Sequence, residues 1–112
     1  MARTPITTHV LNLETGRPAA GVEVGLYRAD DAEPLVTGTT NRDGRIGHWS
    51  SAFFIEPGVH RLCFAVGDWF ASRGVDSFYP QVDIYFSVES AEEHYHVPVL
   101  LNRFGYSTYR GS

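Results

Sequence analysis

The chain has 112 residues, of which 43% are apolar and 20% charged, so it can form one core, and we expect a single domain over residues 1–112. Its net charge is −4, and its nine basic residues, all arginines, are scattered along the chain, which excludes the clustered basic face of a nucleic-acid-binding protein. No stretch approaches the roughly 18 apolar residues of a membrane span, and the N-terminus lacks the apolar core of a signal peptide.

Runs rich in Val, Ile, Phe and Tyr alternate with turn residues about every ten positions, a pattern typical of an all-β domain. The first run, residues 6–13, ends at ETGRPAAG, whose Gly and Pro residues break a regular element. Further strands are predicted over residues 22–28 and 35–40. The Asp43-Gly44 pair then predicts a hairpin turn, because glycine accepts the positive φ that such a turn requires.

The second half of the chain continues this pattern with one interruption. After a longer connection, a strand is predicted over residues 59–66. The segment GDWFASRG, residues 67–74, has Gly at each end, Asp68 near its start and Arg73 in its last turn, which predicts one or two helical turns with charges suited to the dipole. Seven or eight strands with one short helix favour a sandwich of two sheets. The remaining strands are predicted over residues 78–89, 94–101 and 106–110.

Strand alternation predicts the direction of one histidine and leaves another open. In residues 94–101 the apolar side chains alternate onto one face, so His96 is expected to point away from the core. In residues 6–13, His9 shares a face with two leucines and Val10 lies opposite, so alternation does not settle which face is the core. When a strand has apolar side chains on both faces, the face away from the core is expected to be covered by a partner subunit or to line a pocket.

The single cysteine, Cys63, lies in the apolar run RLCFAV. One cysteine forms no internal disulfide, which is typical of a reducing compartment. We therefore interpret Cys63 as a small buried hydrophobe and expect a cytoplasmic protein.

Histidine is the side chain that exchanges a proton near neutral pH, as a general base must. His9, His94 and His96 would also supply three nitrogens to zinc, but no Cys or carboxylate stands at ligand spacing, so neither metal nor cofactor is expected. From spacing alone, surface or hydrogen-bonded histidines are the favoured interpretation, with Arg45 and Arg110 as solvated charges. No G-x-S-x-G elbow or phosphate-binding glycine loop is present.

Several blocks of the sequence resemble one family. ITTHVLNLETGRPAAGVEVGLY is similar to the opening of the transthyretin-related 5-hydroxyisourate hydrolases, and TNRDGRI, SFYPQV, HYHVPVLL and GYSTYRGS are similar to their later blocks, in the same order and spacing. The terminal YRGS is the most specific block, since transthyretin itself does not end this way and carries lysine where this chain has His9. The resemblance implies a transthyretin-like (prealbumin-like) sandwich of two four-stranded antiparallel sheets with one short helix.

The resemblance also implies an activity and a set of site residues. Members of the family hydrolyse 5-hydroxyisourate to 2-oxo-4-hydroxy-4-carboxy-5-ureidoimidazoline, the step that follows urate oxidation in purine catabolism. The two histidines would deprotonate water, and the arginine would stabilise the charge on the attacked carbonyl or hold the substrate. The catalytic positions of the family fall on His9, Arg45 and His96, and its substrate-binding positions on His9, Arg45, Tyr109, Arg110 and Ser112.

The family forms homotetramers, as dimers of dimers, with active sites at the dimer–dimer interface, so the resemblance implies the same assembly here. The alternative is a non-catalytic carrier that uses this channel for a small hydrophobic ligand, as transthyretin does. A carrier of that kind needs an apolar channel lining rather than two histidines and an arginine, which favours the hydrolase.

Overall fold

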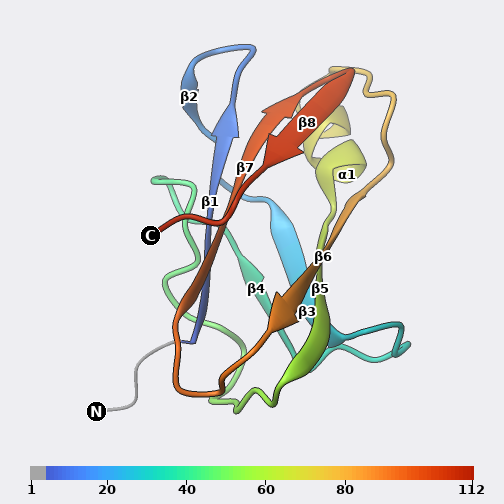
Figure 1. The fold of residues 1–112 in the computed structure, drawn as a ribbon. Helices are drawn as coiled ribbons and strands as arrows, with labels where there is room; N and C mark the ends of the chain where they lie inside the picture. The colour runs from blue at the N-terminus through green and yellow to red at the C-terminus, as the bar shows by residue number, and fades with distance from the viewer. Residues whose placement is uncertain (1–4) are drawn as a thin grey trace.

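Two four-stranded sheets lie face to face in the computed structural model, which describes residues 5–112 (Figure 1). The predicted all-β, transthyretin-like sandwich with one short helix is confirmed. Sheet I has the strand order β2-β1-β7-β8, with the bounds Arg17–Pro18, Ile6–Asn12, Tyr95–Asn102 and Gly105–Thr108. Sheet II has the order β4-β3-β5-β6, with the bounds Val36–Thr39, Glu23–Arg28, Gly58–Phe64 and Val82–Val88.

One strand pair corrects the expectation that both sheets are antiparallel. β1 and β7 run parallel along their whole length, from Ile6 opposite Tyr95 to Asn12 opposite Leu101. The other five strand pairs in the described residues are antiparallel. Turn residues in a sequence indicate hairpins between consecutive strands, but no single turn connects β1 to β7, so local signals do not set their relative direction.

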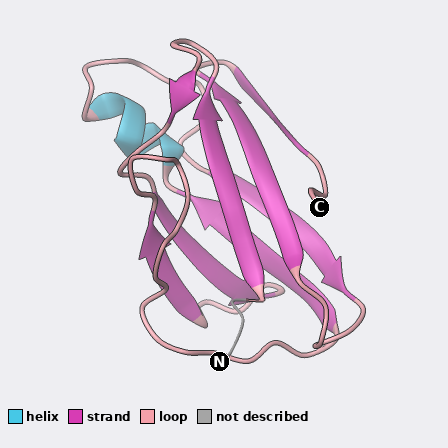
Figure 2. Ribbon diagram, turned by 90° about the vertical axis from the view of Figure 1, so that its left-hand side faces the viewer, coloured by secondary structure: helices cyan, strands magenta, loops and turns pink. Residues whose placement is uncertain are grey.

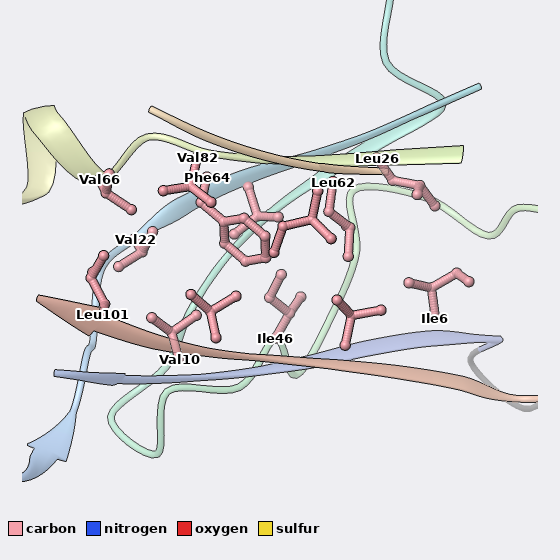
Figure 3. Packing of buried hydrophobic residues seen from close by; sticks show 14 of the residues in the cluster. Ile6, Val10, Val22, Leu26, Ile46, Leu62, Phe64, Val66, Val82 and Leu101 are labelled. Carbon is pink, nitrogen blue, oxygen red and sulfur yellow. The ribbon is translucent and has the colours of Figure 1, made fainter. Parts of the chain in front are cut away.

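The core lies between the sheets and settles which face of β1 is buried (Figure 3). Burial alternates strictly along β1, with Ile6 and Val10 fully buried and His9 only half-buried between core positions. The sequence left open which face of β1 is buried, and this burial pattern places His9 on the outer face of sheet I. In β7, the side chains on either side of His96 are buried as predicted, so His96 lies on the same outer face.

The short helix α1, Val66–Ala71, lies at one end of the sandwich (Figure 2). It begins one residue before its predicted start and is held by Phe70, which is buried, and by Trp69, whose indole N–H donates to the Ala20 carbonyl at 2.7 Å. Arg73, predicted in the last turn, lies beyond the helix, and its guanidinium stacks 3.9 Å from the Trp69 ring. In residues 5–112, no helix has the length and apolar content that crossing a membrane requires.

Three predicted boundaries are corrected. Residues 17–18, expected within a turn, pair with β1 as the two-residue strand β2. The Asp43-Gly44 turn forms, but it does not close the predicted hairpin, because Arg45 after it makes an isolated bridge to His9. β6 begins only at Val82, because the backbone before it turns away to bond with the β7–β8 connection.

Cys63 is half-buried rather than buried, since it alternates with core residues of β5 and faces outward from sheet II. Burial, with Asp83 beside the thiol, raises the pKa of Cys63 to about 11. A thiol with so high a pKa is almost entirely protonated at neutral pH, so Cys63 is a poor nucleophile.

Gly44→Ala is expected to destabilise the fold more than Gly16→Ala. Both glycines have positive φ, +76° and +73°, so each alanine costs about 1–2 kcal/mol of backbone strain. A Cβ at position 44 would also collide with the Val10 carbonyl oxygen, whereas a Cβ at position 16 meets nothing within 4 Å. Urea unfolding of the two variants measures the difference, and equal losses of unfolding free energy would contradict the close approach of the turn to β1.

Candidate functional site

The parallel pairing of β1 and β7 collects polar side chains on the outer face of sheet I. Thr7 lies opposite His96, and His9 lies opposite Pro98. Paired residues of neighbouring strands project to the same face, so the two histidines become neighbours although they are far apart in sequence. His94, just before β7, joins them, with its ring centroid 6.5 Å from that of His96.

The turn at residues 41–44 brings Arg45 to this face. The Val10 N–H donates to the Gly44 carbonyl at 2.8 Å, which ties the turn to β1. Inside the turn, the Asn41 side-chain oxygen accepts hydrogen bonds from two backbone N–H groups, including that of Arg45 at 3.2 Å. Arg45 then bridges to His9 in the isolated antiparallel pair, so its cation lies beside both histidines.

The C-terminal segment closes the other side of the His96 ring. The Gly111 N–H donates to the His96 carbonyl at 2.9 Å. A Cβ on residue 111 would lie 2.5 Å from His96 Cδ2 and 3.2 Å from Pro98 Cγ, so only glycine fits without displacing the imidazole. This close approach explains the glycine of the YRGS ending by packing.

A pocket of about 260 Å³ opens between these elements. Most of the residues that line it are polar or charged, and they include three of the predicted site residues, Arg45, His96 and Ser112. His9 adjoins it through its bridge to Arg45. The complete lining is Thr7, Thr8, Arg45, Ile46, His94, His96 and Ser112.

Tyr109 and Arg110 lie apart from this pocket. They border a second groove of about 310 Å³ between β6 and the C-terminal segment. The Arg110 guanidinium lies 4.7 Å from the Tyr95 ring centroid and 3.7 Å from a carboxylate oxygen of Glu93. Tyr109 is 58% exposed. His96 lines both this groove and the first pocket, so it connects the group around the histidines with Tyr109 and Arg110.

Burial and positive charge favour the neutral form of both histidines. The pKa of His9 is lowered from 6.5 by desolvation and then by the Arg45 cation. The pKa of His96 is lowered by desolvation, then by Arg45, and further by His94 and His9. Neutral imidazoles are proton acceptors, which is the state that a general base needs. A histidine in the unfolded chain binds protons more readily than His9 or His96 does in the folded protein. The free energy of unfolding therefore decreases as the pH falls below about 6.5.

Thr7 is the residue of this site that sequence reasoning missed. Its hydroxyl lies 2.8 Å from His94 Nε2 and 2.8 Å from His96 Nδ1. Alternation along β1 places Thr7 on the face of His9, but its contact with two histidines depends on the register of β1 against β7. Within residues 5–112, the His, Cys, Asp and Glu side chains include no group of three arranged to hold a metal ion.

Comparisons with known proteins identify relatives of this chain in both sequence and fold. Residues 6–111 match the model of the HIUase/transthyretin family. 5-Hydroxyisourate hydrolase 2 of Rhizobium meliloti is 45% identical over 114 residues, covering 96% of this chain and 95% of that protein. The structure of Klebsiella pneumoniae 5-hydroxyisourate hydrolase matches with a TM-score of 0.83 and 39% identity, over 96% and 92% of the two chains. Transthyretin from Sparus aurata matches with a TM-score of 0.86 and 25% identity, over 97% of each chain.

Arg45→Gln is expected to raise the pKa values of both His9 and His96, because it removes a cation that disfavours their protonated forms. Arg42→Gln is the matched control, since Arg42 is exposed in the same turn and affects neither pKa. Proton NMR titration of the imidazole resonances measures both effects. Unchanged histidine pKa values in Arg45→Gln would show that the guanidinium does not face these rings.

Proposed function

Because the chain belongs to the HIUase/transthyretin family, we propose that it hydrolyses 5-hydroxyisourate to 2-oxo-4-hydroxy-4-carboxy-5-ureidoimidazoline, a step of urate degradation. The observation that carries this proposal is the convergence of His9, Arg45 and His96 on one face of sheet I. Two neutral imidazoles beside a fixed cation are the groups that hydrolysis of a ring amide needs.

The reaction proceeds by attack of water on a ring carbonyl. A neutral imidazole of the histidine pair takes one proton from water while the oxygen bonds to the carbonyl carbon. Negative charge develops on the carbonyl oxygen, and the Arg45 guanidinium, a fixed fork of N–H donors, stabilises it. The ring C–N bond then breaks, and the imidazolium returns its proton to the departing nitrogen. The step consumes one water and leaves the histidine neutral again.

The C-terminal segment contributes to the site in two ways. Ser112 lines the pocket, so its hydroxyl is placed to contact the substrate or the attacking water. Arg110 forms an ion pair with Glu93 and lies over the face of the Tyr95 ring. These contacts anchor the C-terminal segment, in which Gly111 packs against His96. Within one chain, Tyr109 and Arg110 line the adjacent groove. We propose that their side chains contact the substrate from this groove.

The alternative of a non-catalytic carrier is less well supported. Ile46 is the one large aliphatic side chain in the pocket lining, and the other lining residues include two histidines and an arginine. A site for a hydrophobic ligand is lined predominantly by apolar groups. The hydrolases compared are also more similar in sequence, at 45% and 39% identity, than transthyretin at 25%.

His9→Ala and His96→Ala are each expected to lower kcat by roughly 10²- to 10⁴-fold, the usual contribution of a general base. Loss of the ultraviolet absorbance of fresh 5-hydroxyisourate, corrected for spontaneous decay, measures the rate. His48→Ala is the control, because His48 is exposed in a loop beside sheet II and borders a different pocket. No acceleration over spontaneous decay by the unsubstituted protein would overturn the proposed activity.

The same assay has an expected pH dependence. The reacting histidine must be neutral, and its pKa is lowered, so kcat/KM should rise with pH through an apparent pKa below 6.5 and then level off. An activity that increases as the pH falls through this range would exclude a neutral histidine base.

We also propose a cytoplasmic homotetramer, a dimer of dimers, with the outer face of sheet I between the dimers. This face carries Leu11 and Leu100 side by side in register, and Leu13 beyond the end of β1 is 53% exposed. Two half-buried leucines and one exposed leucine on the same sheet face are typical of a surface that a second subunit covers.

Size-exclusion chromatography with light scattering is expected to give a mass four times the 12.5 kDa of the chain. Leu100→Arg puts a charge on the outer face of sheet I, so its measured mass should be that of a dimer. Val59→Arg is the control, because Val59 is 46% exposed on the outer face of sheet II. A monomer with full activity would contradict a site completed by neighbouring subunits.

A further inference from the structure

The Thr7 hydroxyl connects two imidazoles that come from distant parts of the sequence. It lies 2.8 Å from His96 Nδ1 and 2.8 Å from His94 Nε2, at separations of 89 and 87 residues. A hydroxyl carries one proton and donates it to one partner only. The other ring must therefore donate an N–H to the Thr7 oxygen, so the protonation pattern of one histidine determines that of the other.

The remaining contacts of His96 determine which of its atoms face the pocket. Nδ1 is engaged by Thr7, and Cδ2 is the ring atom that a Cβ on residue 111 would approach at 2.5 Å. These two atoms lie on opposite sides of the ring, next to the carbon that joins it to the chain. The free edge, Cε1 and Nε2, is therefore the part of His96 that is left for the pocket that it lines.

The charged and titratable groups around His96 distinguish the two possible patterns. Arg45, His94 and His9 act on its ring, and of these Arg45 carries a permanent positive charge. A guanidinium only donates hydrogen bonds, so it favours a ring nitrogen with a free lone pair over a second N–H. This favours the pattern in which His96 Nδ1–H donates to Thr7 and the Thr7 O–H donates to His94 Nε2.

We propose that Thr7 and His94 are positioning residues that hold neutral His96 with its proton on Nδ1 and its lone pair on Nε2. The proposal rests on the proposed function, in which a neutral histidine takes the proton of water. Nε2 of His96 accepts that proton as the water oxygen bonds to the carbonyl carbon, while Nδ1–H continues to donate to Thr7. When the ring C–N bond breaks, Nε2 returns the proton to the departing nitrogen.

The test replaces the hydroxyl without changing the size of the side chain. Thr7→Val removes the hydroxyl that contacts both His94 and His96, whereas Thr7→Ser keeps a hydroxyl at this position. Thr39→Val is the matched control, because Thr39 is an exposed strand threonine of sheet II. Long-range ¹H–¹⁵N NMR spectra of the imidazoles, recorded above pH 7, report the tautomer of His96 directly, and kcat is measured on the same samples.

In the unsubstituted protein and in Thr7→Ser, His96 is expected to be protonated on Nδ1. In Thr7→Val, the Nε2-protonated tautomer should appear and kcat should fall by roughly 10- to 100-fold, with a smaller change in KM, as expected when a base loses its orienting partner. His94→Phe removes the acceptor of the Thr7 proton, so it should also increase the Nε2-protonated form. Thr39→Val should change neither measurement.

The two readouts separate this inference from the proposed function. An unchanged His96 tautomer in both Thr7→Val and His94→Phe would overturn the positioning role, whatever the activity does. A changed tautomer with unchanged kcat would show that His96 is not the base, which overturns the proton transfer through His96 Nε2 and leaves the proposed hydrolysis with His9 as its base.

Discussion

The parallel pairing of β1 with β7 is the constraint on which the site depends. It places Thr7 opposite His96 and His9 opposite Pro98, and thereby joins the beginning of the domain to its end. A shift of one residue in this register would move every side chain of one strand to the opposite face, so the buried positions Ile6 and Val10 protect the register. The core that stabilises the sandwich therefore also determines the geometry of the outer face.

Two close backbone approaches complete the arrangement. Gly44 lets the turn before Arg45 pack against the carbonyl of Val10, and Gly111 lets the C-terminal segment pack against the ring of His96. One approach brings the cation to the histidines, and the other fixes the orientation of an imidazole. Desolvation and then the same cation lower the pKa values of both histidines, so the packing of Gly44 against β1 has an electrostatic consequence.

Much of the fold could be predicted from the sequence, because it depends on local patterns. Alternation in residues 94–101 correctly placed His96 outside the core, and Asp43-Gly44 correctly marked a turn. The direction of β1 against β7 could not be predicted, since no turn connects them, and the contact of Thr7 with two histidines depends on that direction. The position of Arg110 on the Tyr95 face also required the tertiary structure, because a terminal arginine has no local signal for its partner.

The central claim is that His9, Arg45 and His96 act on one reacting centre. The most direct measurement is the kcat for 5-hydroxyisourate of the double variant His9→Ala/His96→Ala, compared with each single variant. Residues that work as a unit show strongly non-additive losses. The account predicts that the double variant loses little more activity than the more severely impaired single variant. Losses that multiply, or a double variant with the activity of the unsubstituted protein, would contradict it.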